Sequence, residues 1–307
     1  MKIRSVLCPT DFSPFSARAL EHAIVLARAY EAELAVLHVY PFVMAMAGDV
    51  PYFPSGVPLD AGKRARLLAE LETVTERARA GGLKPQLLLR EGDPAEEIRK
   101  QVRTMGVDLV VMGTHGHRGL DRWILGSVTR RVEQQAQCAV FTVPPPREGA
   151  PASATPSYEH ILCPVDLGSS EETLAAALAI ARASKARLTL MYVLEGLPQL
   201  ESSVLMAGID WKEFRENLEK TARRSLREAV ARQRTDGVVL DEMVASGKPY
   251  HEILAAADAR GVDLIVLGIH GQNVVERMFF GSTALHVVQQ ARCPVLTVRP
   301  SVDKAKP

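Results

Sequence analysis

The sequence lacks the features that would direct a protein to a membrane or cross-link it covalently. No uncharged apolar run approaches the roughly 18 residues that a membrane span requires. The apolar residues after Met1 stop at Pro9, too soon for the core of a signal peptide. Only four cysteines occur in 307 residues, none in CxxC spacing, so a disulfide framework is excluded. We therefore expect a cytoplasmic protein with buried thiols and no membrane association.

The chain also lacks an excess of charge of one sign. It has 37 Lys and Arg against 36 Asp and Glu, which gives a formal net charge of +1. No general positive field would attract nucleic acid, so we expect no nucleic-acid partner. Hydrophobic residues make up 47%, enough for well-packed cores, and the length favours two domains rather than one.

One domain is present twice in the chain. VLCPTDFS, which begins at Val6, returns as ILCPVDLGS from Ile161; EGDPAEEI returns as SGKPYHEI, and VDLVVMGTHG as VDLIVLGIHG. Equivalent residues such as Asp11 and Asp166 lie 155 positions apart. A Pro-, Ala- and Ser-rich stretch without apolar periodicity separates the copies. We predict a first domain over residues 1–146, a linker over 147–157 and a second domain over 158–302.

Strand-like and helix-like patterns alternate within each copy, which predicts an α/β fold. Apolar runs such as DLVVMG suit parallel strands that are buried on both faces. Right-handed crossovers then give two tandem, doubly wound, parallel five-stranded sheets. In the first copy the expected strands are 3–8, 34–39, 86–90, 109–112 and 139–143, and the expected helices are 16–30, 64–80, 94–105 and 127–137.

The segment after the fourth strand carries the clearest functional signal. Gly113 and Gly116 are followed, after nine intervening residues, by Gly126 and Ser127, and the second copy repeats this spacing. Glycines let backbone N–H groups approach an anion closely, and the following helix N-terminus favours a phosphate. The hydroxyls of Ser127 and Thr129 add donors. We therefore predict a phosphate-binding loop in each copy.

Other motifs are absent or less informative. No GxxxxGK[ST] string exists, and the first strand has no glycine, which excludes a P-loop and a dinucleotide fingerprint. Asp108 and Asp263 precede strands, so we assign them capping or solubility roles at the opposite edge of the sheet. The histidines His115, His117 and His270 raise the hypothesis of a zinc site, but no cysteine lies nearby to complete it.

Together these motifs show that the sequence resembles a tandem universal stress protein of the ATP-binding branch, over nearly all of both copies. The pattern G-x-x-G-x9-G-[ST], the PTD and PVD strings after the first strands, and the closing CPVLTV strand carry this resemblance. It implies a Rossmann-like fold that resembles the adenine nucleotide α-hydrolases and binds ATP, ADP or AMP, with or without Mg²⁺. It also implies that the closing strands pair between the domains as an internal pseudo-dimer, and that homodimerisation is common.

The resemblance also implies the contact residues. Asp11 would meet the ribose or the adenine, and Pro9, Val39 and Met112 would line the adenine slot. The remaining positions would hold phosphates and ribose. The expected set is Pro9, Asp11, Val39, Met112, Gly113, Gly116, His117, Gly126, Ser127, Val128 and Thr129, and in the second copy Pro164, Asp166, Val193, Leu267, Gly268, Gly271, Gly281, Ser282 and Thr283.

The copies differ in ways that predict unequal affinity. The second copy replaces His117-Arg118-Gly119 with Gln272-Asn273-Val274, which removes a cation that would screen phosphate charge. It also replaces Thr129 with Ala284, for which Thr283 would compensate. We expect two nucleotide sites, with the first the tighter.

Three functions remain open from the sequence. A nucleotide-binding stress-response regulator is favoured over a fast enzyme, because Asp121 and Glu276 are the only acidic residues in the loops after the fourth strands. Slow ATP hydrolysis is one alternative. A nucleotide-independent scaffold for a protein partner, as yet unknown, is another, because the insertion over 41–62 and its counterpart from Gly196 are rich in apolar residues.

Overall fold

The computed structural model describes residues 3–40, 45–47, 50–52, 61–116, 125–146, 155–166, 171–235, 237–269 and 281–299. The chain divides into two compact units: residues 2–122 with 126–143 form one, and residues 144–307 make up most of the other. The first and second units correspond to the two sequence repeats, and each is described by itself below.

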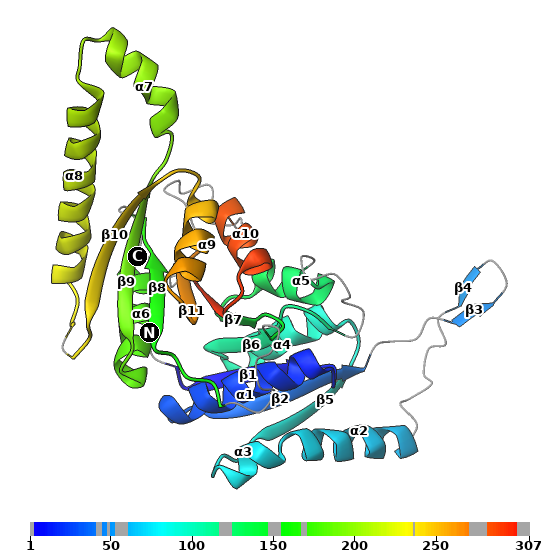
Figure 1. Ribbon diagram of the computed structural model, residues 1–307. Coiled ribbons are helices and arrows are strands. Elements are labelled where there is room, and N and C mark those ends of the chain that lie inside the picture. The colour runs from blue at the N-terminus through cyan, green and yellow to red at the C-terminus, as the bar shows by residue number, and fades with distance from the viewer. Residues whose placement is uncertain are drawn as a thin grey trace, which may run out of the picture. The chain divides into compact units, whose positions relative to one another are not determined.

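The first repeat is a parallel sheet with helices on both faces (Figure 1). Its strands are β1 (Ser5–Thr10), β2 (Glu33–Tyr40), β5 (Gln86–Glu91), β6 (Leu109–Gly113) and β7 (Ala139–Val143), in the spatial order β5-β2-β1-β6-β7. Its helices are α1 (Pro14–Ala29), α2 (Ala61–Val74), α3 (Glu76–Ala80), α4 (Pro94–Met105) and α5 (Ser127–Gln135). A short antiparallel pair, β3 (Ala45–Ala47) and β4 (Val50–Tyr52), lies within the insertion.

The second repeat has the same topology. Its strands are β8 (His160–Pro164), β9 (Arg187–Leu194), β10 (Leu240–Ser246), β11 (Leu264–Gly268) and β12 (Val295–Val298), in the order β10-β9-β8-β11-β12 and all parallel. Its helices are α6 (Glu171–Ser184), α7 (Leu197–Met206), α8 (Trp211–Ala231), α9 (Pro249–Ala259) and α10 (Ser282–Gln290). The prediction of two doubly wound five-stranded parallel sheets is confirmed.

A continuous apolar layer joins each sheet to the helices that follow its third and fourth strands. In the first repeat this layer includes Leu37 of β2, Ile98 of α4 and Val132 of α5, each nearly inaccessible to solvent. Burial of such side chains contributes about 1.5–3 kcal/mol each. The layer therefore fixes α4 and α5 side by side against the sheet, so their N-termini face the same edge.

Two local expectations needed correction. The expected helix over 64–80 is two helices, which meet at Thr75. The buried hydroxyl of Thr75 donates to the carbonyl oxygens of Leu71 (2.8 Å) and Glu72 (3.0 Å), and such back-bonding bends helices. The helix expected over 127–137 ends at Gln135.

The amino-terminal edge of each sheet is closed by an aspartate. Asp108 accepts hydrogen bonds from the N–H groups of Arg4 (2.7 Å) and Ser5 (3.1 Å). Asp263 accepts the equivalent pair from Glu159 and His160 (2.7 and 3.2 Å). These carboxylates thus join the start of one strand to the start of its neighbour, away from the predicted ligand edge.

Candidate functional site

The first sheet places Asp11 and Gly113, two of the predicted residues, at its carboxyl edge on neighbouring strands. Asp11 follows β1, and Gly113 ends β6, the neighbouring strand. The chain proceeds from β1 toward β5 on one side and from β6 toward β7 on the other. Ligands of open α/β sheets bind at such a reversal of strand order, outside the carboxyl ends of the strands.

The loop that leaves β6 is fixed where it starts and where it returns. The N–H of Thr114 donates to the Val143 carbonyl (3.0 Å), and the Thr114 carbonyl accepts from the N–H of Gly126 (2.8 Å). The Thr114 hydroxyl lies 2.9 Å from Nδ1 of the buried His115. Residues 117–124, which include the predicted contact His117, lie outside the described part of the chain.

Close approach bears on three glycines of this loop, Gly113, Gly116 and Gly126. A Cβ at Gly116 would stand 2.6 Å from Oδ2 of Asp11. A Cβ at Gly113 would stand 3.2 Å from the carbonyl oxygen of Phe15, and one at Gly126 would stand 3.2 Å from that of Thr114. At Gly113 and Gly126 a Cβ would therefore press on backbone atoms, and at Gly116 the Asp11 carboxylate would have to move to admit one.

The N-terminus of α5 faces this edge without a side-chain cap. Gly126 occupies the N-cap position, where no side chain accepts a hydrogen bond from the first turn, and Ser127 is exposed. Thr129, which we expected to contact the ligand, is buried and donates its hydroxyl to the Gly113 carbonyl over 2.8 Å. In this structure its hydroxyl joins the end of β6 to the first turn of α5.

The turn after β1 shows a tie that the sequence did not indicate. Oδ1 of Asp11 accepts from the N–H and the hydroxyl of Ser13 (3.1 and 2.6 Å), and Ser13 in turn caps α1. Between them, Phe12 has φ 63°, a left-handed conformation that is uncommon for a bulky residue. Its ring stacks on His38 of β2 with centroids 4.3 Å apart. The apolar patterns of strands and helices in the sequence do not indicate this turn, because it depends on the φ angle of Phe12.

The apolar residues that we expected to line an adenine slot lie below this edge. Val39 and Met112 belong to the same buried cluster, and Val128 packs against it. Pro9, near the end of β1, is partly buried. These side chains form an apolar floor, and their contact with a base stays a prediction.

In the described residues, the second repeat reproduces the points where this loop leaves the sheet and returns to it. The N–H of Ile269 donates to the Val298 carbonyl, and the N–H of Gly281 donates to the Ile269 carbonyl (3.3 and 3.2 Å). A Cβ at Gly268 would stand 2.9 Å from the hydroxyl oxygen of Thr173. Residues 270–280, with the predicted contact Gly271, lie outside the described residues.

The remaining predicted contacts of the second repeat occupy equivalent elements. Ala284 is buried and takes the place of Thr129, so the tie to the end of the strand has no counterpart there. Thr283, one position earlier on α10, is partly exposed, as is Asp166, and Ser282 is exposed. Leu267 lies in the core, and Pro164 and Val193 are partly buried in β8 and β9.

Three further features of the described residues concern metal binding, thiol reactivity and membrane spans. Within the described residues, no three His, Cys, Asp or Glu side chains gather as a metal site would require. All four cysteines are buried, and burial raises the pKa of the Cys8 and Cys163 thiols to about 12, so these thiols are protonated and unreactive near neutral pH. Nor is any helix among these residues long and apolar enough to cross a membrane.

Comparisons with known proteins agree on one family. The model of the universal stress protein family matches residues 2–144 and again residues 157–299. A universal stress protein of Mycobacterium tuberculosis is 27% identical over 302 residues, which cover 97% of each chain. One of Methanocaldococcus jannaschii is 35% identical over 148 residues, 47% of this chain and 84% of that protein. The crystal structure of a universal stress protein from Archaeoglobus fulgidus superimposes with a TM-score of 0.71 at 21% identity, covering 97% of this chain and 99% of that one.

Proposed function

Because this chain belongs to the universal stress protein family and carries its domain twice, we propose that it binds an adenine nucleotide at the carboxyl edge of each sheet and acts as a stress-response regulator. The ligand is ATP, ADP or AMP, with or without Mg²⁺. The proposal depends on this chain's own residues.

The observation that carries the proposal is the glycine-lined loop at an uncapped helix N-terminus. Gly113, Gly116 and Gly126 stand where a Cβ would meet backbone or the Asp11 carboxylate. The first-turn N–H groups of α5 receive no side-chain cap. Backbone amides at a helix N-terminus favour an anion both by hydrogen bonding and through the helix dipole. This arrangement fits a phosphate group better than a neutral ligand.

Asp11 fits the sugar of the same ligand. Its carboxylate lies against Gly116 at the start of the loop, and a carboxylate accepts hydrogen bonds from ribose hydroxyls. The ties from Ser13 hold this carboxylate in place before a ligand arrives. The loop and the carboxylate together suit a nucleotide rather than inorganic phosphate.

We further propose a regulatory rather than a catalytic role. Rapid phosphoryl transfer needs a metal clamp and a residue that orients water. In the described part of the edge, Asp11 is tied to Ser13. Turnover faster than about 1 per second would overturn this role, whereas slow hydrolysis is compatible with it.

Calorimetric titration with ATP tests the nucleotide proposal. The wild-type chain is expected to bind two equivalents, Gly113→Val and Gly268→Val one each, and the double variant none. Each single variant carries the other repeat as its internal control. Two equivalents in all four proteins, or none in the wild type, would contradict the proposal. Mass spectrometry of material released from freshly purified protein then identifies the nucleotide.

One observation favours the alternative of a scaffold that binds a protein partner. The end of α7 and the turn after it expose Leu205, Met206 and Ile209, with 55%, 89% and 48% of their surface accessible. Exposed apolar clusters often mark contact surfaces. A scaffold would act without nucleotide, so a chain that binds no ATP but retains function in cells would favour it. Pairing of the two repeats and homodimerisation stay predictions, the latter testable by sedimentation.

A further inference from the structure

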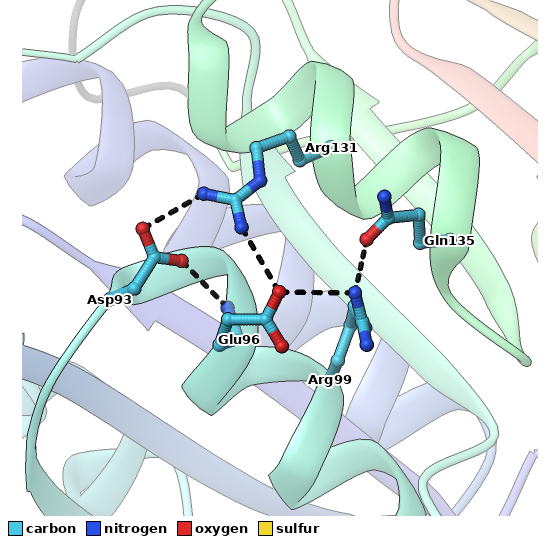
Figure 2. Close-up of polar contacts among 5 residues, drawn as sticks. All are labelled: Asp93, Glu96, Arg99, Arg131 and Gln135. Carbon is cyan, nitrogen blue, oxygen red and sulfur yellow. Dashed lines mark hydrogen bonds and ion pairs between the residues drawn. The ribbon is translucent and has the colours of Figure 1, made fainter.

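Five side chains join α4 to α5 on the first repeat (Figure 2). Arg131 of α5 bridges two carboxylates of α4: its Nη1 donates to Asp93 (2.8 Å) and its Nη2 to Glu96 (3.0 Å). Arg99 donates to the same Glu96 oxygen (3.2 Å) and to the side-chain oxygen of Gln135. We refer to Asp93, Glu96, Arg99, Arg131 and Gln135 as the α4–α5 ion cluster.

The cluster ties the first two turns of α4 to the part of α5 that follows its first turn. Asp93 is the N-cap of α4, where its Oδ1 accepts from the N–H of Glu96 over 2.9 Å. Arg131 lies four residues after Ser127, one turn into α5. Because α4 and α5 pack side by side with their N-termini at the same edge, the cluster holds α5 directly after its N-terminal turn.

The charges of the cluster are matched. Two guanidinium groups face two carboxylates, so no net charge is added next to the loop. Partial desolvation acts to raise the pKa of Asp93, but the Glu96 amide and Arg131 outweigh it and hold this pKa below its usual value. Single exposed ion pairs contribute little, whereas a bridging network on two packed helices constrains their relative position.

In the second repeat a different contact joins the equivalent helices, α9 and α10. At the equivalent positions stand Lys248 for Asp93, His251 for Glu96 and His286 for Arg131. There the ring of Tyr250 on α9 stacks on His286 of α10, with centroids 4.5 Å apart. Lys248 provides no side-chain cap for α9. An aromatic contact therefore replaces the bridged carboxylates.

We propose that the α4–α5 ion cluster, through Arg131, positions the N-terminal turn of α5 for phosphate and thereby sets the nucleotide affinity of the first repeat above that of the second. The inference rests on the proposed nucleotide site. Arg131 is a positioning residue: its guanidinium is engaged by Asp93 and Glu96, and it acts through the backbone amides of the α5 N-terminus.

Arg131→Gln, made in the Gly268→Val background so that only the first repeat binds, tests this positioning. Its affinity for ATP should fall about three- to tenfold, because the bridge between the helices is lost. Arg130→Gln is the matched control. It removes the same charge from an exposed neighbour, for which the described residues offer no ion pair, and should change affinity less than about twofold. Arg131→Lys keeps the charge but reaches one carboxylate, so it should recover part of the loss.

The outcomes distinguish failure of the nucleotide site from failure of the positioning role of Arg131. If the parent Gly268→Val protein binds no ATP, the proposed function fails. If it binds ATP but Arg131→Gln and Arg130→Gln weaken binding equally, the charge near the loop matters and the positioning role is refuted. An unchanged affinity in Arg131→Gln refutes it as well. Thermal unfolding of each variant, measured in parallel, identifies any affinity loss caused by unfolding of the repeat.

Discussion

The two repeats share one backbone plan but hold the edge around the predicted ligand site with different chemistry. In the first, the Thr129 hydroxyl ties α5 to the end of β6, and the α4–α5 ion cluster ties α5 to α4. In the second, Ala284 fills the place of Thr129, and Tyr250 and His286 stack where the cluster would be. At these two places the first repeat uses hydrogen bonds and ion pairs between side chains and their neighbours, and the second uses an apolar side chain and an aromatic contact.

This difference shows which features the fold requires and which are adjustable. Both repeats keep the glycine after the fourth strand, the hydrogen bond that returns the loop to the sheet, and the aspartate that joins two strand starts. These features depend on backbone geometry, which two copies of one fold must share. The helix contacts lie outside the sheet and vary without altering it.

The largest expected effect comes from adding a side chain at Gly126, where the loop returns to the sheet. Gly126→Val should lower the affinity of the first repeat by about 100-fold or more, because a Cβ there would stand 3.2 Å from the Thr114 carbonyl and the bulk blocks the approach of an anion. Gly281→Val should cost the second repeat less, since its nearest contact is at 3.4 Å. Calorimetric titration with ATP measures both. A larger loss in Gly281→Val would reverse the order.

Next in size is a change that should affect both repeats. Asp108→Ala and Asp263→Ala each remove two hydrogen bonds to backbone N–H groups, and each should reduce the free energy of unfolding by about 2 kcal/mol. Desolvation raises the pKa of Asp263, so its loss should cost the less of the two. Urea denaturation at pH 7 gives both values. Nucleotide affinity should be unchanged, because these residues lie at the opposite edge.

A smaller effect is expected from removing the hydrogen bond between the Thr129 hydroxyl and the Gly113 carbonyl. Thr129→Ala leaves the buried Gly113 carbonyl without this donor, which should lower the stability of the first repeat by about 1 kcal/mol and its ATP affinity by about fivefold. The reciprocal Ala284→Thr places a hydroxyl one position after Thr283 and should raise the affinity of the second repeat. If Thr129→Val, which keeps the shape, binds ATP as the wild type does, the hydroxyl has no role.

The smallest expected effect is on the stability of the first repeat at acid pH. The pKa of Asp93 is lowered in the folded state, so its contribution is fully present above the ordinary aspartate value of about 3.9 and is lost as the pH falls through the folded pKa. Asp93→Asn should therefore lower stability slightly at pH 7 and lower it less at an acid pH below the ordinary aspartate pKa. Lys248→Asn, at the equivalent position of the second repeat, is the control and should show no such acid dependence. Urea midpoints at the two pH values provide the test.

Much of the architecture was predictable from the sequence because its patterns are local and repeated. The apolar run over Leu109–Gly113, buried throughout, indicated the fourth strand of the first repeat, and the Asp93-Pro94 pair indicated the start of α4. The break of the second helix at Thr75 was not predictable, since a single threonine leaves the helical periodicity intact. The glycines of the loop were identified by spacing, and the structure adds what each one approaches.

Other features of the site needed the folded chain. The donation from Thr129 to Gly113 joins residues 16 positions apart, and the bridge from Arg131 to Asp93 spans 38. No helical or strand period connects such positions. The left-handed Phe12 and its stacking on His38 are likewise fixed by the meeting of two strands.

The sequence alone determined that one α/β domain occurs twice and that each copy carries small residues after its fourth strand, because apolar periodicity and a fixed offset are properties of the linear chain. The tertiary structure decided which polar groups meet: Asp11 with Gly116, Thr129 with the end of β6, and Arg131 with Asp93. The physical reason is that hydrogen bonds and ion pairs act only over a few ångströms, and only the packed sheet and helices bring these distant residues within that range.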